Sequence, residues 1–253
     1  MDTEVRRREI LRMARQVGYV DVTDLANDLT VSKETVRRDL NALEGHGLVR
    51  RTHGGAHPVE SAGFETTLAL RSIRHVPEKA RVATAAAQLL GEAETLFIDE
   101  GYTPQLIAQS MPRDRQLTVV TASLGVAHIL ADADRIEVLL LGGRVRSGTM
   151  ASVDHWATQM LAGFAIDLAF IGANGISREY GLTTPDPAVN ELKAQAMRSA
   201  QRHIFAGVHT KFGCASFCRF AHVSDIETIV TDSGLPSAEA QRYSMLGPRV
   251  IRV

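Results

Sequence analysis

Seven short apolar segments, rich in β-branched and aromatic residues, constrain the fold of this chain more than any other feature. Helical stretches such as 78–90 and 190–201 lie between them. Strands that are buried on both faces read as continuous apolar runs, and strands that alternate with helices form parallel sheets. We therefore predict an α/β domain with a parallel sheet covered by helices on both faces. The predicted strands are 95–99, 117–121, 136–141, 167–172, 203–208, 228–232 and 249–253.

The first sixty residues have a different pattern, in which three helical segments precede a pair of glycines. A helix ends at Gly18, a short second helix covers 24–29, and a third covers 33–46, with Ser32 as its N-cap. A weakly alternating run at 48–52 and the turn His53-Gly54-Gly55-Ala56 predict a small β-wing. The chain is thus divided into a winged helix-turn-helix domain (1–57), a linker with one short helix at most (58–76) and the α/β domain (77–253).

The third helix carries the strongest functional signal in the first domain. Its apolar stripe faces the core, which places Arg37, Arg38 and Asn41 on the opposite face. Arginine can donate two hydrogen bonds to guanine, asparagine can pair with adenine, and the N-terminal residues of a recognition helix reach base edges. The predicted DNA-contacting residues are Arg6, Arg7, Ser32, Lys33, Thr35, Arg37, Arg38, Asn41, Arg51 and His53.

Arg6, Arg7 and Arg8 lie near the start of the first helix, where the helix dipole disfavours positive charge. Phosphate contact is the preferred explanation, and solubility is the alternative. Asp39 falls nearer the core stripe of the third helix, so we expect it to pair with an arginine inside the fold. The net charge of −1 does not oppose DNA binding, because the basic residues are clustered.

The composition bears on the cellular location of the protein and on metal binding. No apolar run approaches the roughly 20 residues that span a bilayer, and the start lacks an apolar targeting segment, so we expect a cytoplasmic protein without a membrane partner. Cys214, Cys218 and His222 would share one face of a helix if their segment is helical, and zinc is conceivable there. Small buried cysteines are common, however, and we predict no metal and no cofactor.

Polar and glycine-rich segments follow several of the predicted strands. Asp99 ends one strand and precedes Gly101 and a helix that begins near Thr103, while the next strands are followed by Thr121 with Ser123 and by Gly142 with Gly143. Open α/β sheets bind ligands at the carboxyl ends of their strands, and helix N-termini attract anions. We therefore expect these segments and Gly172 to form one crevice, in which Asp99 accepts hydrogen bonds from ligand hydroxyls.

The segments V-S-K-E-T-V-R-R-D-L-N-A-L-E (31–44) and G-L-V-R-R-T-H-G-G-A (47–56) resemble the DNA-binding signature of the DeoR family of bacterial repressors, and the resemblance extends through the C-terminal half. It implies a Rossmann-like sensor domain similar to the ribose-phosphate isomerase and CoA-transferase fold, which binds a phosphorylated sugar. The family motifs that bind this effector correspond here to Asp99, Gly101, Thr103, Thr121, Ser123, Gly142, Gly143, Lys193 and Lys211.

The sequence departs from the family pattern at Tyr102, Ala122 and His209-Thr210. Tyr102 replaces a threonine of the family pattern, whose hydroxyl would help to hold an anion. The Tyr102 ring is able to stack on a sugar ring, so we add Tyr102 to the predicted effector-binding residues. A sugar acid, a modified sugar or an unphosphorylated polyol therefore remain open as effectors. Solvent-exposed side chains are the alternative for both Lys193 and Lys211.

These observations predict a sequence-specific DNA-binding repressor of carbohydrate-metabolism genes, released by a sugar phosphate or a related sugar-derived effector. The alternative is a regulator that activates transcription instead of repressing it. The expected partners are operator DNA, the effector and further copies of the chain, as a homodimer or homotetramer. The alternative class is an enzyme, a sugar-phosphate isomerase or a CoA-transferase-like protein, with Asp99 and Glu100 as candidate bases. We predict that the chain is not an enzyme, because segment 170–175 lacks the acidic residues that such isomerases carry there.

Overall fold

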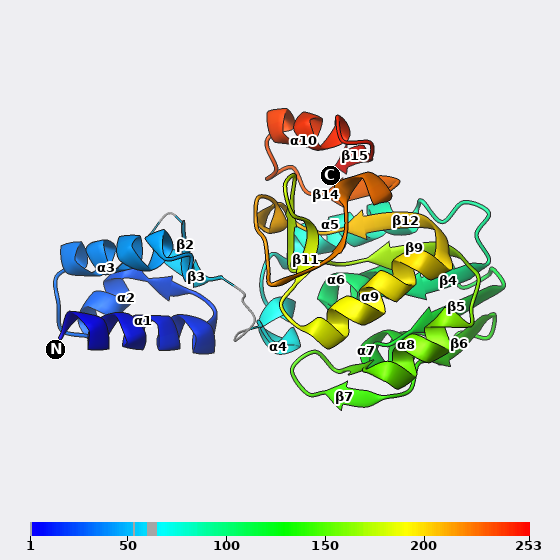
Figure 1. The fold of residues 1–253 in the computed structure, drawn as a ribbon, viewed down its shortest axis with the longest axis horizontal. Coiled ribbons are helices and arrows are strands. Elements are labelled where there is room, and N and C mark those ends of the chain that lie inside the picture. The colour runs from blue at the N-terminus through cyan, green and yellow to red at the C-terminus, as the bar shows by residue number, and fades with distance from the viewer. Residues whose placement is uncertain (1, 53, 60–64) are drawn as a thin grey trace. The chain divides into compact units, whose positions relative to one another are not determined.

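The computed structural model describes residues 2–52, 54–59 and 65–253. The chain forms two compact units, Met1–Thr66 and Thr67–Val253 (Figure 1). No helix in the described part of the chain is both long and apolar enough to cross a membrane.

The first unit contains the three predicted helices and a small antiparallel sheet with the strand order β1-β3-β2 (Figure 1). Its elements are α1 (Thr3–Val17), β1 (Val20–Asp21), α2 (Val22–Asp28), α3 (Lys33–Gly45), β2 (Val49–Thr52) and β3 (Gly55–Pro58). Helix α2 begins earlier than predicted because the Asp21 carboxylate accepts the backbone N–H of Thr23 at 2.6 Å and so caps the helix. The two-residue strand β1 was too short to show any alternation.

One glycine of the wing, Gly55, is required by close packing. A Cβ atom on Gly55 would lie 2.1 Å from the Val20 carbonyl oxygen and 2.4 Å from the Tyr19 hydroxyl, so only glycine lets β3 approach β1. The fully buried side chains of Ile10 and Leu40 belong to the core of this unit. The first unit therefore has a hydrophobic core of its own.

The second unit is built on a seven-stranded parallel sheet with the order β15-β14-β12-β9-β4-β5-β6. Each of the seven predicted apolar segments is one strand of this sheet. The strands are β4 (Thr95–Ile98), β5 (Leu117–Thr121), β6 (Ile136–Leu140), β9 (Ile166–Ile171), β12 (Ala200–Ala206), β14 (Thr228–Thr231) and β15 (Arg249–Arg252).

Helices cover both faces of this sheet, as predicted (Figure 1). In β4, Leu96 and Ile98 pack into one core with α5 to α7, whereas Phe97 packs into a second core with α8 and α9. The helices are α4 (Leu68–Ser72), α5 (Val76–Ala87), α6 (Tyr102–Gln109), α7 (Leu124–Leu130), α8 (His155–Ala162), α9 (Pro187–Ser199) and α10 (Ser237–Ser244), with 3₁₀ turns η1 (His209–Lys211) and η2 (Val223–Asp225).

Two small antiparallel sheets were not predicted. They consist of β7 (Arg144–Arg146) with β8 (Ala151–Val153), and of β10 (Gly175–Ser177), β11 (Gly181–Thr184) and β13 (Cys218–Ala221). Cys218 begins a strand and His222 precedes η2, so Cys214, Cys218 and His222 do not share a helix face. Among the described residues, no three His, Cys, Asp or Glu side chains are placed to hold a metal ion.

Candidate functional site

The outward face of α3 is polar and accessible. Lys33, Arg37, Arg38 and Asn41 are exposed, and Thr35 is half-buried. The Ser32 Oγ accepts the backbone N–H of Thr35 at 3.1 Å, which confirms Ser32 as the N-cap of the helix. The helix thus presents exposed side chains capable of hydrogen bonding to base edges and phosphates.

The wing is fastened to α3 by Arg51. Its guanidinium donates to the Asn41 Oδ1, and its backbone N–H donates to the Glu44 Oε1 at 2.7 Å. Bidentate pairing with adenine uses both the oxygen and the amino group of an asparagine. The Asn41 oxygen has two lone pairs, so it is able to accept from adenine while it keeps its bond with Arg51. His53 lies outside the described residues.

Arg6 and Arg7 have partners inside the first unit. Arg6 is 8% exposed, and its Nε lies 2.5 Å from the Oδ2 of Asp39, while the Arg7 Nε lies 3.0 Å from the Oδ1. The hydrogen bond with Asp39 raises the pKa of Arg6 above its ordinary value. The predicted internal pairing of Asp39 is confirmed, and the phosphate contact predicted for Arg6 gives way to a role in holding α1 against α3. Arg8 is exposed.

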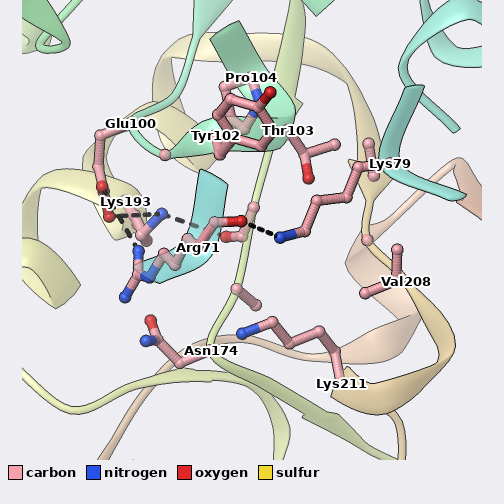
Figure 2. Close-up of a pocket in the computed structure, with 15 residues that line it drawn as sticks. Arg71, Lys79, Glu100, Tyr102, Thr103, Pro104, Asn174, Lys193, Val208 and Lys211 are labelled. Atoms are coloured by element: carbon pink, nitrogen blue, oxygen red, sulfur yellow. Dashed lines mark hydrogen bonds and ion pairs between the residues drawn. The ribbon is translucent and has the colours of Figure 1, made fainter. Parts of the chain in front are cut away.

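A pocket of about 70 Å³ opens in the second unit beside the carboxyl ends of β4, β9 and β12 (Figure 2). It includes the turn that begins α6, at Gly101, whose φ of +118° favours glycine. The residues that line it are Arg71, Lys79, Glu100, Gly101, Tyr102, Thr103, Pro104, Gly172, Ala173, Asn174, Lys193, Ala206, Gly207, Val208 and Lys211.

Lys193 and Asp99 form a buried ion pair behind the pocket surface. Both residues are 2% exposed, and the Lys193 Nζ bonds to the Asp99 Oδ2 and to the Gly172 carbonyl oxygen at 3.2 Å. Asp99 also accepts the backbone N–H groups of Glu100 at 2.8 Å and of Gly172 at 2.9 Å. Asp99 therefore orients Lys193, and this corrects the prediction that its carboxylate faces ligand hydroxyls. Lys193 is not a solvent-exposed lysine.

Four polar or charged residues of the pocket were not among the predicted effector residues: Arg71, Lys79, Glu100 and Asn174. The Lys79 Nζ donates to the Arg71 carbonyl oxygen at 2.5 Å and lies 5.6 Å from the centre of the Tyr102 ring. The sequence did contain an indication for Lys79, since this lysine lies on the same buried stripe of α5 as Val82 and Ala83. Arg71 gave no signal, since the five-residue helix α4 is too short to show a period.

The charge of the pocket is predominantly positive. Arg71, Lys79, Lys193 and Lys211 line it, whereas Glu100 is the one carboxylate among the lining residues that the structure describes. Glu100 lies 3.8 Å from Arg71 and 4.0 Å from Lys193. In Figure 2 the Lys211 ammonium points toward Asn174. Cations in a recess with low solvent exposure favour an anionic ligand, and Asn174 and Thr103 add polar groups for hydroxyls.

Besides Asp99, four of the predicted effector residues do not line the pocket. Thr121 donates its hydroxyl to the Ile98 carbonyl oxygen at 2.6 Å, and Ser123 accepts the backbone N–H of Val126 at 3.3 Å, so both stabilise the fold. Gly142 and Gly143 precede β7, and a Cβ atom on Gly143 would lie 2.3 Å from the Val153 carbonyl oxygen. The expected single crevice therefore contains Gly101, Tyr102, Thr103, Gly172, Lys193 and Lys211 but not these four residues.

Two family models together match most of the chain. A model described as the DeoR-like helix-turn-helix domain matches residues 6–62, and a model described as the DeoR C terminal sensor domain matches residues 74–233. A solved structure of a probable sor operon regulator from Shigella flexneri covers 68% of this chain and 90% of its own, with a TM-score of 0.44 and 11% identity.

Several relatives match almost the whole chain, and two of them serve as examples. The HTH-type transcriptional regulator GlpR of Haloferax volcanii is 33% identical over 246 residues, which are 97% of this chain and 96% of that protein. The glycerol-3-phosphate regulon repressor of Escherichia coli is 30% identical over 238 residues, 93% of each chain. The chain therefore belongs to the DeoR family, with that family's helix-turn-helix domain in its first unit and its sensor domain in its second.

Proposed function

We propose that this chain is a sequence-specific DNA-binding repressor of carbohydrate-metabolism genes, and that an anionic sugar-derived effector releases it from DNA. The observation that carries the proposal is the cationic pocket, which occurs in the same chain as the exposed polar face of α3. Phosphorylated sugars and polyols are the first class to test, and the name of the relative from Escherichia coli points to glycerol 3-phosphate as one member of it.

The first unit supports the DNA-binding half of the proposal. Helix α3 displays Lys33, Arg37 and Arg38 to solvent, and the wing is held against it through Arg51. One such domain reads a short half-site, so two copies of the chain are expected on a symmetric operator.

The pocket supports the effector half. Lys193 is held by Asp99 and Gly172, while Lys211 and Arg71 approach from other elements, so an anion would meet cations from several directions. Because Lys193 is already held in place, an anion binds it without the cost of ordering that long side chain first.

Of the two candidate bases of the enzyme alternative, the geometry argues against Asp99 and places Glu100 on the pocket wall. A general base must reach the proton that it removes. The Asp99 carboxylate instead accepts from Lys193 and from two backbone N–H groups, and it is 2% exposed. The relatives described above are named as transcriptional regulators.

The experiment has two stages. Operator sequences are first selected from random duplexes with the purified full-length chain, and affinity is then measured by fluorescence anisotropy. Glycerol 3-phosphate, hexose phosphates, their unphosphorylated counterparts and sugar acids are next screened by thermal shift. An effector at about 100 times its Kd should stabilise the fold by about 2.7 kcal/mol, and the same compound should lower operator affinity.

Lys211→Gln provides the matched variant for the screen. It should bind the operator like the parent and require about tenfold or more of the effector, because it loses a charged hydrogen bond. Failure of the parent to select any sequence, or a ligand that stabilises the chain without changing operator affinity, would contradict the proposal.

A further inference from the structure

Helix α4 lies in a part of the chain that neither family model covers. The matched regions end at residue 62 and resume at residue 74, and α4 spans Leu68–Ser72 between them. It is also the first element of the second unit, which begins at Thr67. Nevertheless, its residue Arg71 lines the pocket (Figure 2).

Arg71 is tied to the pocket through both its side chain and its backbone. Its Nη1 lies 3.8 Å from the Glu100 Oε2, and its carbonyl oxygen accepts from the Lys79 Nζ at 2.5 Å. At the start of the helix, the Leu68 backbone N–H donates to the Gly148 carbonyl oxygen at 2.7 Å. Helix α4 is therefore held in place by groups on the wall of the pocket and by the loop between β7 and β8.

The Arg71 to Glu100 separation is long for oppositely charged groups. Charge-assisted N–H···O bonds measure about 2.7–2.9 Å, so the 3.8 Å pair attracts without a short hydrogen bond between those two atoms. A phosphate or carboxylate offers two oxygens to the planar guanidinium, which it can bind in bidentate fashion. The anion would also repel the Glu100 carboxylate and compete with it for the Arg71 guanidinium. Binding of the anion therefore favours a shift of Arg71 away from Glu100 and toward the ligand.

We propose that Arg71 binds the anionic group of the effector and that the accompanying shift of α4 carries the signal to the DNA-binding unit. This inference rests on the proposed function. The chain runs from α4 into the first unit through Thr67 and Thr66, with no other described element between them. A ligand changes DNA affinity only through its unequal affinity for two arrangements of the chain, and contact with Arg71 supplies such a difference.

The binding part is tested on the full-length chain with inorganic phosphate as the probe, by isothermal titration calorimetry. Arg71→Gln should raise the phosphate Kd about tenfold or more, because a charged hydrogen-bond donor is lost. Arg74→Gln is the matched control, since Arg74 follows α4 and is not among the described residues that line the pocket. It should stay within about twofold of the parent. Equal affinities in the two variants would overturn the proposal.

The transmission part is tested by operator affinity with and without saturating phosphate, with chloride at equal ionic strength as the reference. The ratio of the two affinities measures coupling. For Arg74→Gln, whose altered residue is not among the described residues that line the pocket, the ratio at saturation should match that of the parent, whereas for Arg71→Gln it should fall toward one. Weakened phosphate binding with a fully retained ratio in Arg71→Gln would show that α4 does not carry the signal.

Arg71→Lys keeps the inference testable if Arg71→Gln does not fold. It retains the charge but lacks the planar fork, so its phosphate affinity and its coupling ratio should both lie between those of the parent and those of a chain without the charge. Parent-like values for both would overturn the proposal. Failure of the parent to bind any operator would instead contradict the proposed function, and the calorimetric comparison would still decide whether Arg71 binds the anion.

Discussion

The outer face of α3 and the wall of the pocket are both rich in cationic side chains, but these side chains differ in their exposure to solvent and in their partners. Arg37 and Arg38 on α3 are exposed to solvent. Lys193 in the pocket is 2% exposed and has fixed partners, and Lys79 is 8% exposed with its ammonium on a backbone carbonyl. Similar residue types therefore serve two physically different tasks within one chain.

The difference determines what each surface is able to recognise. Exposed charges act through water, are screened over about 8 Å at physiological salt, and suit a long polyanion such as DNA. Buried charges interact more strongly and in a fixed geometry, which suits a single small anion. Stability should therefore depend on the cations of the pocket, and salt-sensitive affinity on those of the first unit.

The largest effect is expected where a buried pair is broken. Lys193→Met leaves the Asp99 carboxylate buried without its cation, and such a change costs about 3–5 kcal/mol of unfolding free energy. Urea unfolding of the full-length chain, followed through a probe in the second unit, measures the loss. The matched exposed variant, Arg37→Met, should change stability by at most about 0.5 kcal/mol. A cost below about 1 kcal/mol for Lys193→Met would remove the distinction between the two regions.

A smaller effect is expected on DNA affinity. If Arg38 makes the predicted bidentate base contact, Arg38→Ala should weaken operator binding by about 1–3 kcal/mol and relax the sequence preference. Arg8→Ala, in contrast, should weaken binding to all sequences and reduce the salt slope by about one unit, as loss of a phosphate contact does. Anisotropy titrations at several salt concentrations separate the two results. Parent-like affinity and selectivity in Arg38→Ala would show that α3 uses another face.

The smallest effect concerns acid. Burial would raise the pKa of Asp232, but bonds from the His209 backbone N–H at 2.6 Å, the His209 ring at 2.7 Å and the Gly234 N–H at 3.0 Å outweigh it, and the pKa is lowered. A lowered pKa gives stability above the unfolded value of about 3.9, which is lost as the pH falls through the folded value.

Asp232→Asn should accordingly reduce stability by about 1 kcal/mol at pH 7 and flatten the decline of stability below about pH 4. Urea unfolding between pH 3 and pH 7 checks both effects. Arg38→Ala is a suitable control, since loss of an exposed α3 charge should leave this acid profile unchanged. An equally steep acid decline in Asp232→Asn would mean that other carboxylates produce it.

The larger elements were predictable from the sequence because their physical cause is local. Strands buried on both faces must be apolar throughout, and for this reason every strand of the parallel sheet was identified. The three-residue strands β7, β8 and β10 are too short for a pattern to emerge. The segment that contains Cys218 becomes a strand only through its pairing with β11, a contact that sequence spacing does not reveal.

The site was predictable in part. Lys193, Lys211 and the turn at Gly101 were identified and do line one pocket. Thr121 was misplaced because position at a strand end does not show where a hydroxyl points, and its hydroxyl bonds to the neighbouring strand. Arg71 was missed because its place in the pocket depends on how α4 packs.

The order of the strands has a consequence for how the protein folds. Strand β4 pairs on one side with β5, close in sequence, but on the other with β9, where Leu96 faces Leu168. The central part of the sheet therefore cannot form until β9, which is far from β4 in the sequence, is available for pairing. Non-local pairing of this kind is slow. The helix-turn-helix unit has a local core and is synthesised before the second unit. A nascent chain should thus complete the part that contacts DNA before the part that responds to an effector.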